Sequence, residues 1–353
     1  MKILTHEDKT YPGFVKKLYR RAIPSDAVSE TVAEIVSEVA KKGDRALVAY
    51  AKKFDGARLT AKSLRVTGAE LEVARNSVSR ETKEAIKSSL KNIHAFAAKS
   101  LRKNWKVKNP QGVEVGERFV PFDRVGVYVP GGKAPLVSTS LMTAGFAQAA
   151  GVPEIVAATP PGGDGSINPD LLYALEAAGA TEIYKAGGAH GIAALSLGTK
   201  LIAPVDKVFG PGNTFVVEAK RPMVGAVSID LLPGPSEVLI ASDATGNARF
   251  LASDLLAQAE HSPGAAILVA WDIDVVDAIE KEIQLQVGEL SRAKLTVDCL
   301  NEFGLLICAR DRVHAMELTN QIAPEHLHIQ TDDSRSFMSG IRNAGATFLG
   351  HQT

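Results

Sequence analysis

Residues 125–151 read VGVYVPGGKAPLVSTSLMTAGFAQAAG, and this stretch decides the fold class. Its first residues are apolar and β-branched, its middle is a glycine turn, and its end has the composition of a buried helix. A strand that leads through a glycine turn into a helix is half of a βαβ unit, the unit from which parallel sheets are built. Because GVYV is apolar on both faces, the strand should lie between two helix layers. The stretch therefore predicts an α/β protein.

The same order of strand, turn and helix recurs along the chain. EIVAATPPGG at 154–163 leads into a helical stretch at 168–180, EIYKAGGAH at 182–190 into another, and DKVFGPGN at 206–213 into a third. After Asp230 the pattern resumes with SEVLIAS, the helical NARFLASDLLAQAEH and the strand-like AAILVAW. We therefore predict two α/β domains with parallel-rich sheets.

The first 105 or so residues are rich in charge and in helix formers. Val28, Val32, Ile35 and Val39 recur at helical spacing, and a second such run covers about 69–103. We predict that residues 1–120 hold these N-terminal helices and the first part of domain 1. Residues 121–235 would form an inserted domain 2, and residues 236–353 the remainder of domain 1.

Composition excludes several classes of protein. The 353 residues carry 40 Lys+Arg and 40 Asp+Glu, so the chain lacks the basic excess of a nucleic-acid or membrane-surface binder. It has no apolar run near the ~20 residues that span a bilayer, and its two cysteines are too few for a disulfide framework. We expect a cytoplasmic enzyme with a small-molecule substrate and no nucleic-acid or membrane partner.

Three glycine-rich turns are candidates for a phosphate site. They are 130–132, 187–191 and 210–213, each after a strand and before a helix. Such a turn presents backbone N–H groups and the positive end of a helix dipole to an anion. None matches the usual dinucleotide or P-loop patterns, so each could be only a tight turn. Three together favour a nucleotide-sized anionic ligand.

Gln258 and His261 lie three residues apart at the end of a predicted helix, so their side chains share one face. They could form part of a metal or substrate site, or His261 could simply interact with the helix dipole. Ser236 begins a predicted strand, where it could bind a ligand or only form a turn.

Glu325 and His326 follow Pro324, which disfavours the helical region for Ala323 and so stiffens the turn. A turn lets both side chains reach one cavity, where a carboxylate and an imidazole suit proton transfer and activation of water. The alternative is two polar residues at the entrance of a strand.

These stretches together resemble the histidinol dehydrogenase family over nearly the whole chain. The resemblance is carried by VGVYVPGGKAPLVST, KAGGAHGIAALSLGT, VDKVFGPGNTFVVEAKR, LPGPSEVLI, ASDLLAQAEH and IAPEHL. It implies a homodimer whose chains have two incomplete Rossmann-like domains, and it assigns NAD binding to residues 121–235. It also implies a zinc ion and the oxidation of L-histidinol through an aldehyde to L-histidine, which reduces two NAD molecules and ends histidine biosynthesis.

Carried over residue by residue, the resemblance gives roles to eight positions. Glu325 and His326 match the catalytic pair. Gln258 and His261 match zinc ligands that also lie at the substrate, and His326 and Ser236 match substrate contacts. The positions that match NAD contacts are Tyr128, His190 and Asn213, with His190 where the family usually has Gln.

One departure affects these expectations. Beyond the match to Phe348-Leu349-Gly350, the family continues into a segment with an Asp zinc ligand and a tail that gives a Glu and a His to the partner's site, whereas this sequence stops at Thr353. With two of four zinc ligands we expect weak zinc binding and ordinary NAD binding. Two alternatives stay open: oxidation of another small polar alcohol, and a non-catalytic truncated homologue.

Overall fold

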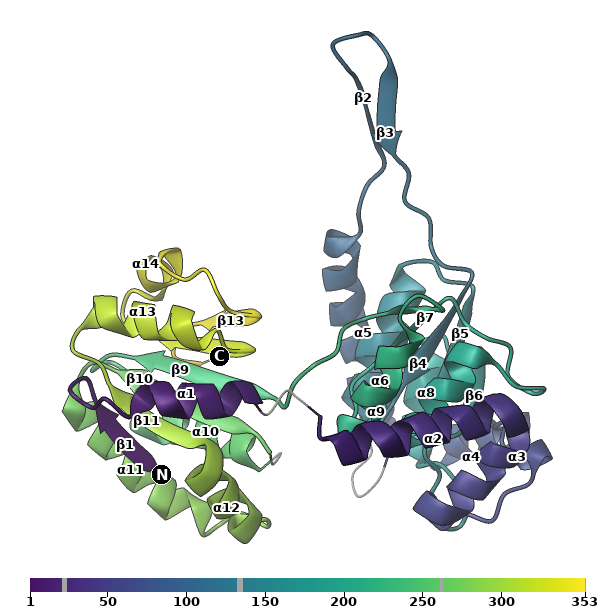
Figure 1. Cartoon of the computed structure of the whole chain (residues 1–353), viewed down its shortest axis with the longest axis horizontal. Coiled ribbons are helices and arrows are strands. Elements are labelled where there is room, and N and C mark those ends of the chain that lie inside the picture. The colour runs from purple at the N-terminus through teal and green to yellow at the C-terminus, as the bar shows by residue number, and fades with distance from the viewer. Residues whose placement is uncertain (21–23, 132–135, 261–262, 353) are drawn as a thin grey trace. The chain divides into compact units, whose positions relative to one another are not determined.

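The computed structural model describes residues 1–20, 24–131, 136–260 and 263–352 (Figure 1). The chain divides into two compact units. Unit 1 comprises Met1–Ile23 with Pro233–Thr353, and unit 2 comprises Pro24–Leu232. Each unit is built on an open parallel sheet with helices on both faces, as the α/β prediction requires. Among the described residues, no helix has the length and apolar character needed to cross a membrane.

Unit 2 contains a five-stranded sheet in the order β6-β5-β4-β7-β8, with every pairing parallel. The chain winds from β4 through β5 to β6 on one side, then returns to add β7 and β8 on the other side of β4. The winding therefore reverses between β4 and β7. The strands are β4 (Arg124–Tyr128), β5 (Glu154–Thr159), β6 (Glu182–Lys185), β7 (Lys207–Phe209) and β8 (Ser228–Ile229).

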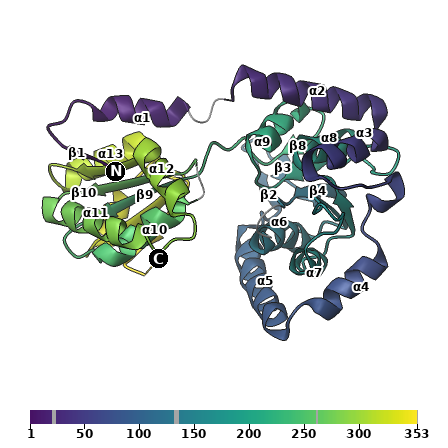
Figure 2. The same cartoon turned by 90° about the horizontal axis from the view of Figure 1, so that it is seen from below.

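Two helix layers cover this sheet. One core joins the sheet to α2 (Asp26–Lys42), α3 (Asp44–Tyr50), α8 (Gly188–Leu197) and α9 (Thr214–Lys220). Figure 2 shows α2 along α8 and α9. The opposite core joins it to α4 (Gly68–Ser77), α5 (Arg80–Ser100), α6 (Val137–Ala149) and α7 (Pro169–Ala177). Short helical turns occupy Ala51–Asp55, Ala61–Ser63 and Arg221–Met223.

The N-terminal helices therefore differ from the predicted boundary at residue 121. Residues 24–120 belong to unit 2, and not to the domain built from the two flanks. The reason is packing: Val32, Ile35 and Val39 of α2 lie in one core of unit 2, and Ile86 and Leu90 of α5 lie in the other.

A hairpin of β2 (Trp105–Lys108) and β3 (Glu114–Glu117) extends away from the rest of unit 2 (Figure 1). All eight of its strand residues are exposed, including Trp105, Val107 and Val115.

Unit 1 contains a six-stranded sheet in the order β1-β11-β10-β9-β12-β13, again with parallel pairings. Its strands are β1 (Lys2–Thr5), β9 (Glu237–Ser242), β10 (Ala265–Ala270), β11 (Gly304–Cys308), β12 (His326–Gln330) and β13 (Ala346–Leu349). Its helices are α1 (Tyr11–Arg20), α10 (Ala248–Ala259), α11 (Ile273–Val287), α12 (Ala293–Phe303), α13 (Arg312–Ile322) and α14 (Ser334–Ser339). The chain winds from β9 through β10 to β11, then returns to β12 and β13 on the other side of β9. Apart from the added β1, this is the winding of unit 2.

The carboxyl edge of the unit 1 sheet is acidic where its winding reverses. Asp243 follows β9, and its Oδ2 accepts a hydrogen bond of 3.1 Å from the backbone N of Asp332, which lies just after β12. Burial by itself would raise the pKa of Asp243, but hydrogen bonds from Thr245 and Asp332 outweigh it and lower that pKa. Asp243 therefore stays ionised at neutral pH.

Candidate active site

Ser236 and Glu325 meet at the amino edge of the unit 1 sheet. Ser236 precedes β9, Glu325 precedes β12, and these strands are neighbours in the sheet. The Ser236 hydroxyl donates to Glu325 Oε2 over 2.7 Å, and the backbone N–H of Glu237 donates to the same oxygen over 3.2 Å. These bonds fix the carboxylate while its side chain stays 48 % exposed. Glu325 is thus oriented and still open to water.

His326 lies beside this carboxylate and is held in one tautomer. Its Nδ1 is 3.1 Å from the carbonyl oxygen of Glu237 and 3.6 Å from Glu325 Oε2. Because a carbonyl oxygen can only accept a hydrogen bond, Nδ1 carries the hydrogen and Nε2 of the neutral ring keeps its lone pair. The side chain is 38 % exposed. Nε2 is therefore available as a base.

The turn before this pair is strained. Ala323 ends α13 with φ 52° and ψ 59°, and it is the one non-glycine residue with positive φ in the described part of the chain. A left-handed alanine costs roughly 1–2 kcal/mol. The expectation that Ala323 leaves the helical region before Pro324 is confirmed, and the strain lies next to the site, as is common at functional sites.

Gln258 lies in the last turn of α10, which leads to the amino end of β10. Its Nε2 is buried and has no hydrogen-bond partner. An unpaired buried amide is costly unless something binds it, so this side chain is a candidate ligand contact. His261, predicted to act with Gln258, lies outside the described residues.

Tyr128 and His190 both lie at the carboxyl edge of the unit 2 sheet, and the His190 ring packs against the rings of Tyr50 and Phe54. Tyr128 ends β4, and its hydroxyl oxygen accepts a 2.9 Å hydrogen bond from the backbone N–H of Gly188, the first residue of α8. Burial, aided by the charge of Asp55, raises the pKa of Tyr128 to about 12. His190, in the first turn of α8, is 1 % exposed, and neither ring nitrogen has a hydrogen-bond partner. Burial lowers the pKa of His190 to about 4, so its ring is neutral.

Asn213 lies at the same edge, after β7. Its Oδ1 caps α9 by accepting hydrogen bonds from the backbone N of Phe215 and Val216. The predicted residue Tyr128 therefore ends β4, and Asn213 follows β7. The winding reverses between these two strands, and ligands of open α/β sheets bind at such a point. Of the three predicted glycine turns, 130–132 is described only through Gly131.

Two features of unit 2 were missed by the sequence reasoning. Lys220 is 1 % exposed, and its Nζ donates to the Gly210 carbonyl over 2.6 Å and to Asp230 Oδ1 over 2.7 Å. Asp230 Oδ2 in turn accepts from the Gly210 N–H over 2.9 Å. We name these three residues the Gly210 clamp. Gly210 itself has φ +124°, and a Cβ there would lie 2.1 Å from the Tyr128 carbonyl oxygen.

The second missed feature is Asp55, which ends the turn after α3. Its Oδ2 is buried without a partner, and burial raises its pKa to about 6. A single Asp in a charged, helical stretch gave no signal of Asp55, and Lys220 stands among the charged residues of FVVEAKRPM, which gave no sign of its burial.

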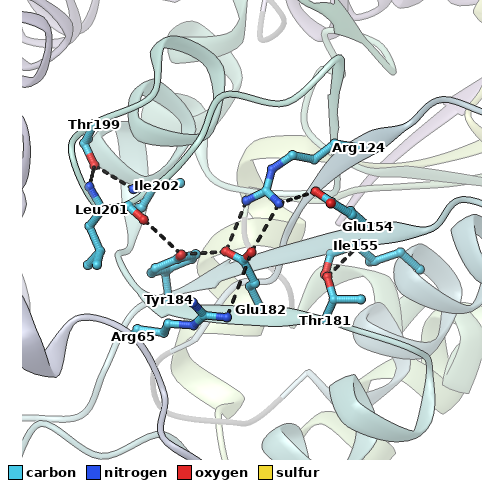
Figure 3. Close-up of polar contacts among 10 residues, drawn as sticks. All are labelled: Arg65, Arg124, Glu154, Ile155, Thr181, Glu182, Tyr184, Thr199, Leu201 and Ile202. Atoms are coloured by element: carbon cyan, nitrogen blue, oxygen red, sulfur yellow. Dashed lines mark hydrogen bonds and ion pairs between the residues drawn. The ribbon is translucent and has the colours of Figure 1, made fainter.

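The amino edge of the unit 2 sheet is pinned by Arg124 (Figure 3). Arg124 begins β4 and donates to both carboxylate oxygens of Glu182 over 3.2 and 3.1 Å, and to Glu154 over 2.6 Å. Tyr184 adds a 2.6 Å bond to Glu182. Because the charged groups pair with one another across three strands, we interpret this cluster as structural; only Arg124 Nε is buried in it without a hydrogen-bond partner.

Arg124→Met is expected to lower the free energy of unfolding by about 2 kcal/mol at neutral pH, because Glu182 loses the two hydrogen bonds from Arg124 and keeps only Arg65 at 3.9 Å and the Tyr184 hydroxyl. Burial alone would raise the pKa of Glu182, but hydrogen bonds from Arg124 and Tyr184 outweigh it and lower that pKa. The stabilisation is therefore present above the unfolded-state pKa and disappears as the pH falls through the folded-state pKa. The free energies of unfolding of parent and variant, measured by urea denaturation, should therefore converge in acid.

The control is Arg80→Met, which loses only an exposed pair with Glu84. It should change the free energy of unfolding by less than ~0.5 kcal/mol at either pH. A pH-independent gap would contradict the ionic origin.

The fold and the site define a class. An open parallel sheet whose winding reverses is typical of α/β enzymes, and a carboxylate–imidazole pair suits proton transfer. The Histidinol dehydrogenase family model matches residues 18–353. The chain is 44% identical over 337 residues to histidinol dehydrogenase of Rhodopirellula baltica, covering 96% of this chain and 73% of that protein. It is 41% identical over 353 residues to the enzyme of Syntrophotalea carbinolica, covering 99% and 82%.

A solved structure agrees with these relatives. The crystal structure of histidinol dehydrogenase from Elizabethkingia anophelis is 34% identical and superposes with a TM-score of 0.93, covering 100% of this chain and 81% of that chain. The chain belongs to the histidinol dehydrogenase family, so the predicted family is confirmed. It is accordingly an enzyme, an oxidoreductase of histidine biosynthesis.

Proposed function

We propose that this chain oxidises L-histidinol to L-histidine through the aldehyde, using two NAD molecules. The observation that carries the proposal is the arrangement of Ser236, Glu325 and His326, in which the carboxylate is oriented by two hydrogen bonds and the imidazole is held with Nε2 as base. The membership of the family supplies the substrate class.

In the first oxidation, His326 Nε2 takes the hydroxyl proton of the alcohol while the carbon loses a hydride. Glu325 then removes a proton from water as the water oxygen attacks the aldehyde carbon, while the proton that His326 Nε2 took in the first step passes to the aldehyde oxygen, which gives the hydrate and frees Nε2 again. In the second oxidation, His326 takes a hydroxyl proton of this hydrate while the carbon loses its second hydride, and the carboxylic acid results. Ser236 keeps the Glu325 carboxylate oriented toward the water through these steps.

NAD, when bound, accepts each hydride. The residues of unit 2 fit such a ligand: Tyr128 and Asn213 border the reversal point, and His190 has two buried nitrogens without partners. A neutral imidazole can both donate and accept, so His190 suits the hydroxyl and amide groups of a dinucleotide.

His190→Leu provides a test of this pocket. The variant keeps a similar volume and removes two buried polar atoms that have no partner in the free protein. We expect the free protein to gain up to about 1 kcal/mol of stability, whereas NAD binding should weaken about tenfold by calorimetric titration. Unchanged NAD affinity would remove His190 from the pocket. No binding heat or thermal shift for the parent with millimolar NAD would contradict the placement of the pocket itself.

Zinc binding by Gln258 and His261 is a further proposal. The zinc ligand of Gln258 would be its Oε1, because an amide nitrogen offers no lone pair to a metal, and the unpartnered Nε2 shows only that the side chain has no internal bond at that nitrogen. The described residues alone do not make a zinc site, since no group of three His, Cys, Asp or Glu side chains among them could hold a metal. Competition with a chromophoric chelator would test the proposal. Gln258→Leu should weaken zinc binding if this side chain is a ligand, and equal affinity would exclude it.

We also propose a homodimer. The support is the exposed β2–β3 hairpin, because an isolated hairpin with exposed Trp105, Val107 and Val115 is marginal in water and gains from a partner surface. Light scattering after size-exclusion chromatography tests this. The cytoplasmic location and the lack of nucleic-acid or membrane partners stay predictions.

The decisive assay is NADH formation by the purified protein with L-histidinol. Two NADH per histidinol, with histidine as product, is the expected result. A panel of small polar alcohols without the imidazole group is the control. Faster turnover of one of these would favour the alternative substrate, and no turnover with any alcohol would contradict the proposed activity.

A further inference from the structure

A row of polar side chains crosses one face of β12. Alternation along the strand puts His326, His328 and Gln330 on one face, whereas Leu327 and Ile329 point into the opposite apolar core. Gln330 is buried, and His328 is largely so. Three consecutive polar positions on the inner face of a central strand are not explained by packing, because apolar side chains would fill that space at lower cost.

Asp254 joins this row to α10. Its Oδ2 accepts a 3.0 Å hydrogen bond from Gln330 Nε2 and lies 3.3 Å from His328 Nδ1. A carboxylate can only accept, so His328 donates from Nδ1. Asp254 is half-buried, and a single oxygen thus bonds α10 to two positions of β12.

The same helix face and the same strand face lead to the active site. Asp254 and Gln258 are four residues apart and therefore lie on one face of α10, about 6 Å apart along its axis. His328 and His326 are two residues apart on one face of β12, about 6.6 Å along the strand. The end of α10 and the beginning of β12 both lie at the amino edge of the sheet. We call the bonds of Asp254 to His328 and Gln330 the Asp254 bridge. From this bridge to the amino edge of the sheet, helix α10 and strand β12 therefore advance by nearly the same length.

We propose that Asp254 is a positioning residue for the reaction: by bonding His328 and Gln330 it fixes α10 against β12, so that the end of α10 stays in register with His326 and Glu325. This inference rests on the proposed function, because the register matters only if His326 and Glu325 perform the chemistry. Asp254 acts through the geometry of the two elements and not through contact with the substrate.

Asp254→Ala and Asp254→Asn separate position from charge. Alanine removes both bonds, and a displacement of about 1 Å at a reacting group can cost about a hundredfold. We therefore expect kcat for histidinol to fall by about 10- to 100-fold in the alanine variant, with KM for NAD unchanged. Asparagine can place its carbonyl oxygen where Oδ2 lies and accept both bonds, so it should keep kcat within about threefold.

Ser253→Ala is the matched control. Ser253 is the neighbouring residue of α10 and also makes two hydrogen bonds, to the carbonyl of Arg249 and to Gln286. These bonds do not reach β12, so this variant should keep the parental kcat. If Asp254→Ala fails to fold, Gln330→Met removes only one bond of the bridge and should lower kcat by about threefold.

A double-mutant cycle with His326→Asn shows whether Asp254 acts through the base. In the His326→Asn background, Asp254→Ala should cost less than about threefold more, because the group that it positions is already absent. Three results would overturn the proposal: parental kcat in Asp254→Ala, the same loss with and without His326, or an asparagine variant as slow as the alanine variant. An asparagine variant as slow as the alanine variant would mean that the negative charge of Asp254 matters, as it would if His328 carried a proton during the reaction.

A readout without turnover separates this inference from the proposed function. If the parent does not oxidise histidinol, the proposed function fails, but the register can still be measured by nitrogen NMR of the histidine rings. Asp254→Ala should shift the signals of His326, which Asp254 does not contact, whereas Asp254→Asn should leave them near their parental positions. Unshifted His326 signals in the alanine variant would refute the positioning role.

Discussion

His326→Asn is expected to slow the oxidation of histidinol by about 10²–10⁴-fold, the usual cost of losing one general base. Asparagine keeps similar bulk and can still donate to the Glu237 carbonyl, which His326 Nδ1 contacts at 3.1 Å. What it lacks is a basic nitrogen in the place of Nε2. Because both oxidations require a hydroxyl proton to leave, the variant should be slow with histidinol and with the supplied aldehyde. Stopped-flow measurement of NADH formation with each substrate provides the test.

Glu325→Gln should produce a different pattern. The amide can still accept the 2.7 Å bond from Ser236 but cannot remove a proton from water. The oxidation of supplied aldehyde should therefore fall more than the oxidation of the alcohol. The matched control is Ser236→Ala, which leaves the carboxylate but frees its orientation, and should cost less than Glu325→Gln. If both Glu325→Gln and His326→Asn turned over histidinol and the aldehyde at parental rates, the pair would be structural.

Lys220→Met should lower the free energy of unfolding by about 3 kcal/mol. The ammonium is 1 % exposed and bonds both the Gly210 carbonyl and Asp230. Methionine fills the space but leaves Asp230 without its charge partner and releases the 210–213 turn, so NAD binding should weaken as well. Chemical denaturation and NAD titration measure the two effects. Lys200→Met, at an exposed lysine, should change neither quantity.

A double variant refines the test. Lys220→Met with Asp230→Asn removes both charges, and the replacement of a whole buried pair costs less than the loss of one partner. The double variant should therefore be more stable than Lys220→Met alone, while its NAD binding stays weak because the Gly210 clamp is still open. A double variant less stable than the single one would show that the charge on Asp230 is not the source of the loss.

The sequence predicted the strands of the sheets better than it predicted the unit against which each N-terminal helix packs. Short apolar, β-branched runs before glycine turns are typical of buried parallel strands, so β4 to β7 were predicted from the residues alone. The periodicity of Val32, Ile35 and Val39 predicted a helix correctly, but periodicity says which face is buried and not against what. Their assignment to the flanking domain was wrong for that reason, since these residues pack in unit 2.

The candidate site was predicted unevenly. Glu325 and His326 are adjacent in sequence, and Pro324 marked the turn, so local chemistry indicated a site there. The bond from Ser236 to Glu325 spans 89 residues, and only the resemblance to a family brought the two together. The Gly210 clamp and the Asp254 bridge had no such guide, because single charges 10 and 74 residues from their partners give no pattern along the chain.

The shared winding of the two units has a consequence for the timing of catalysis. In unit 2 the reversal point is bordered by glycine turns and helix N-termini, whereas at the same point of unit 1 Asp243 and Asp332 lie side by side. The ionised Asp243 carboxylate repels phosphate, whereas Asp230 at the unit 2 reversal is paired with Lys220, so under the proposed function the dinucleotide binds at the unit 2 reversal. The proposed reaction would then release its two hydrides into one pocket, in turn. Under the proposed function the first NADH would depart and a fresh NAD would arrive while the aldehyde stays bound, so the residence time of that intermediate would have to exceed the time of the exchange.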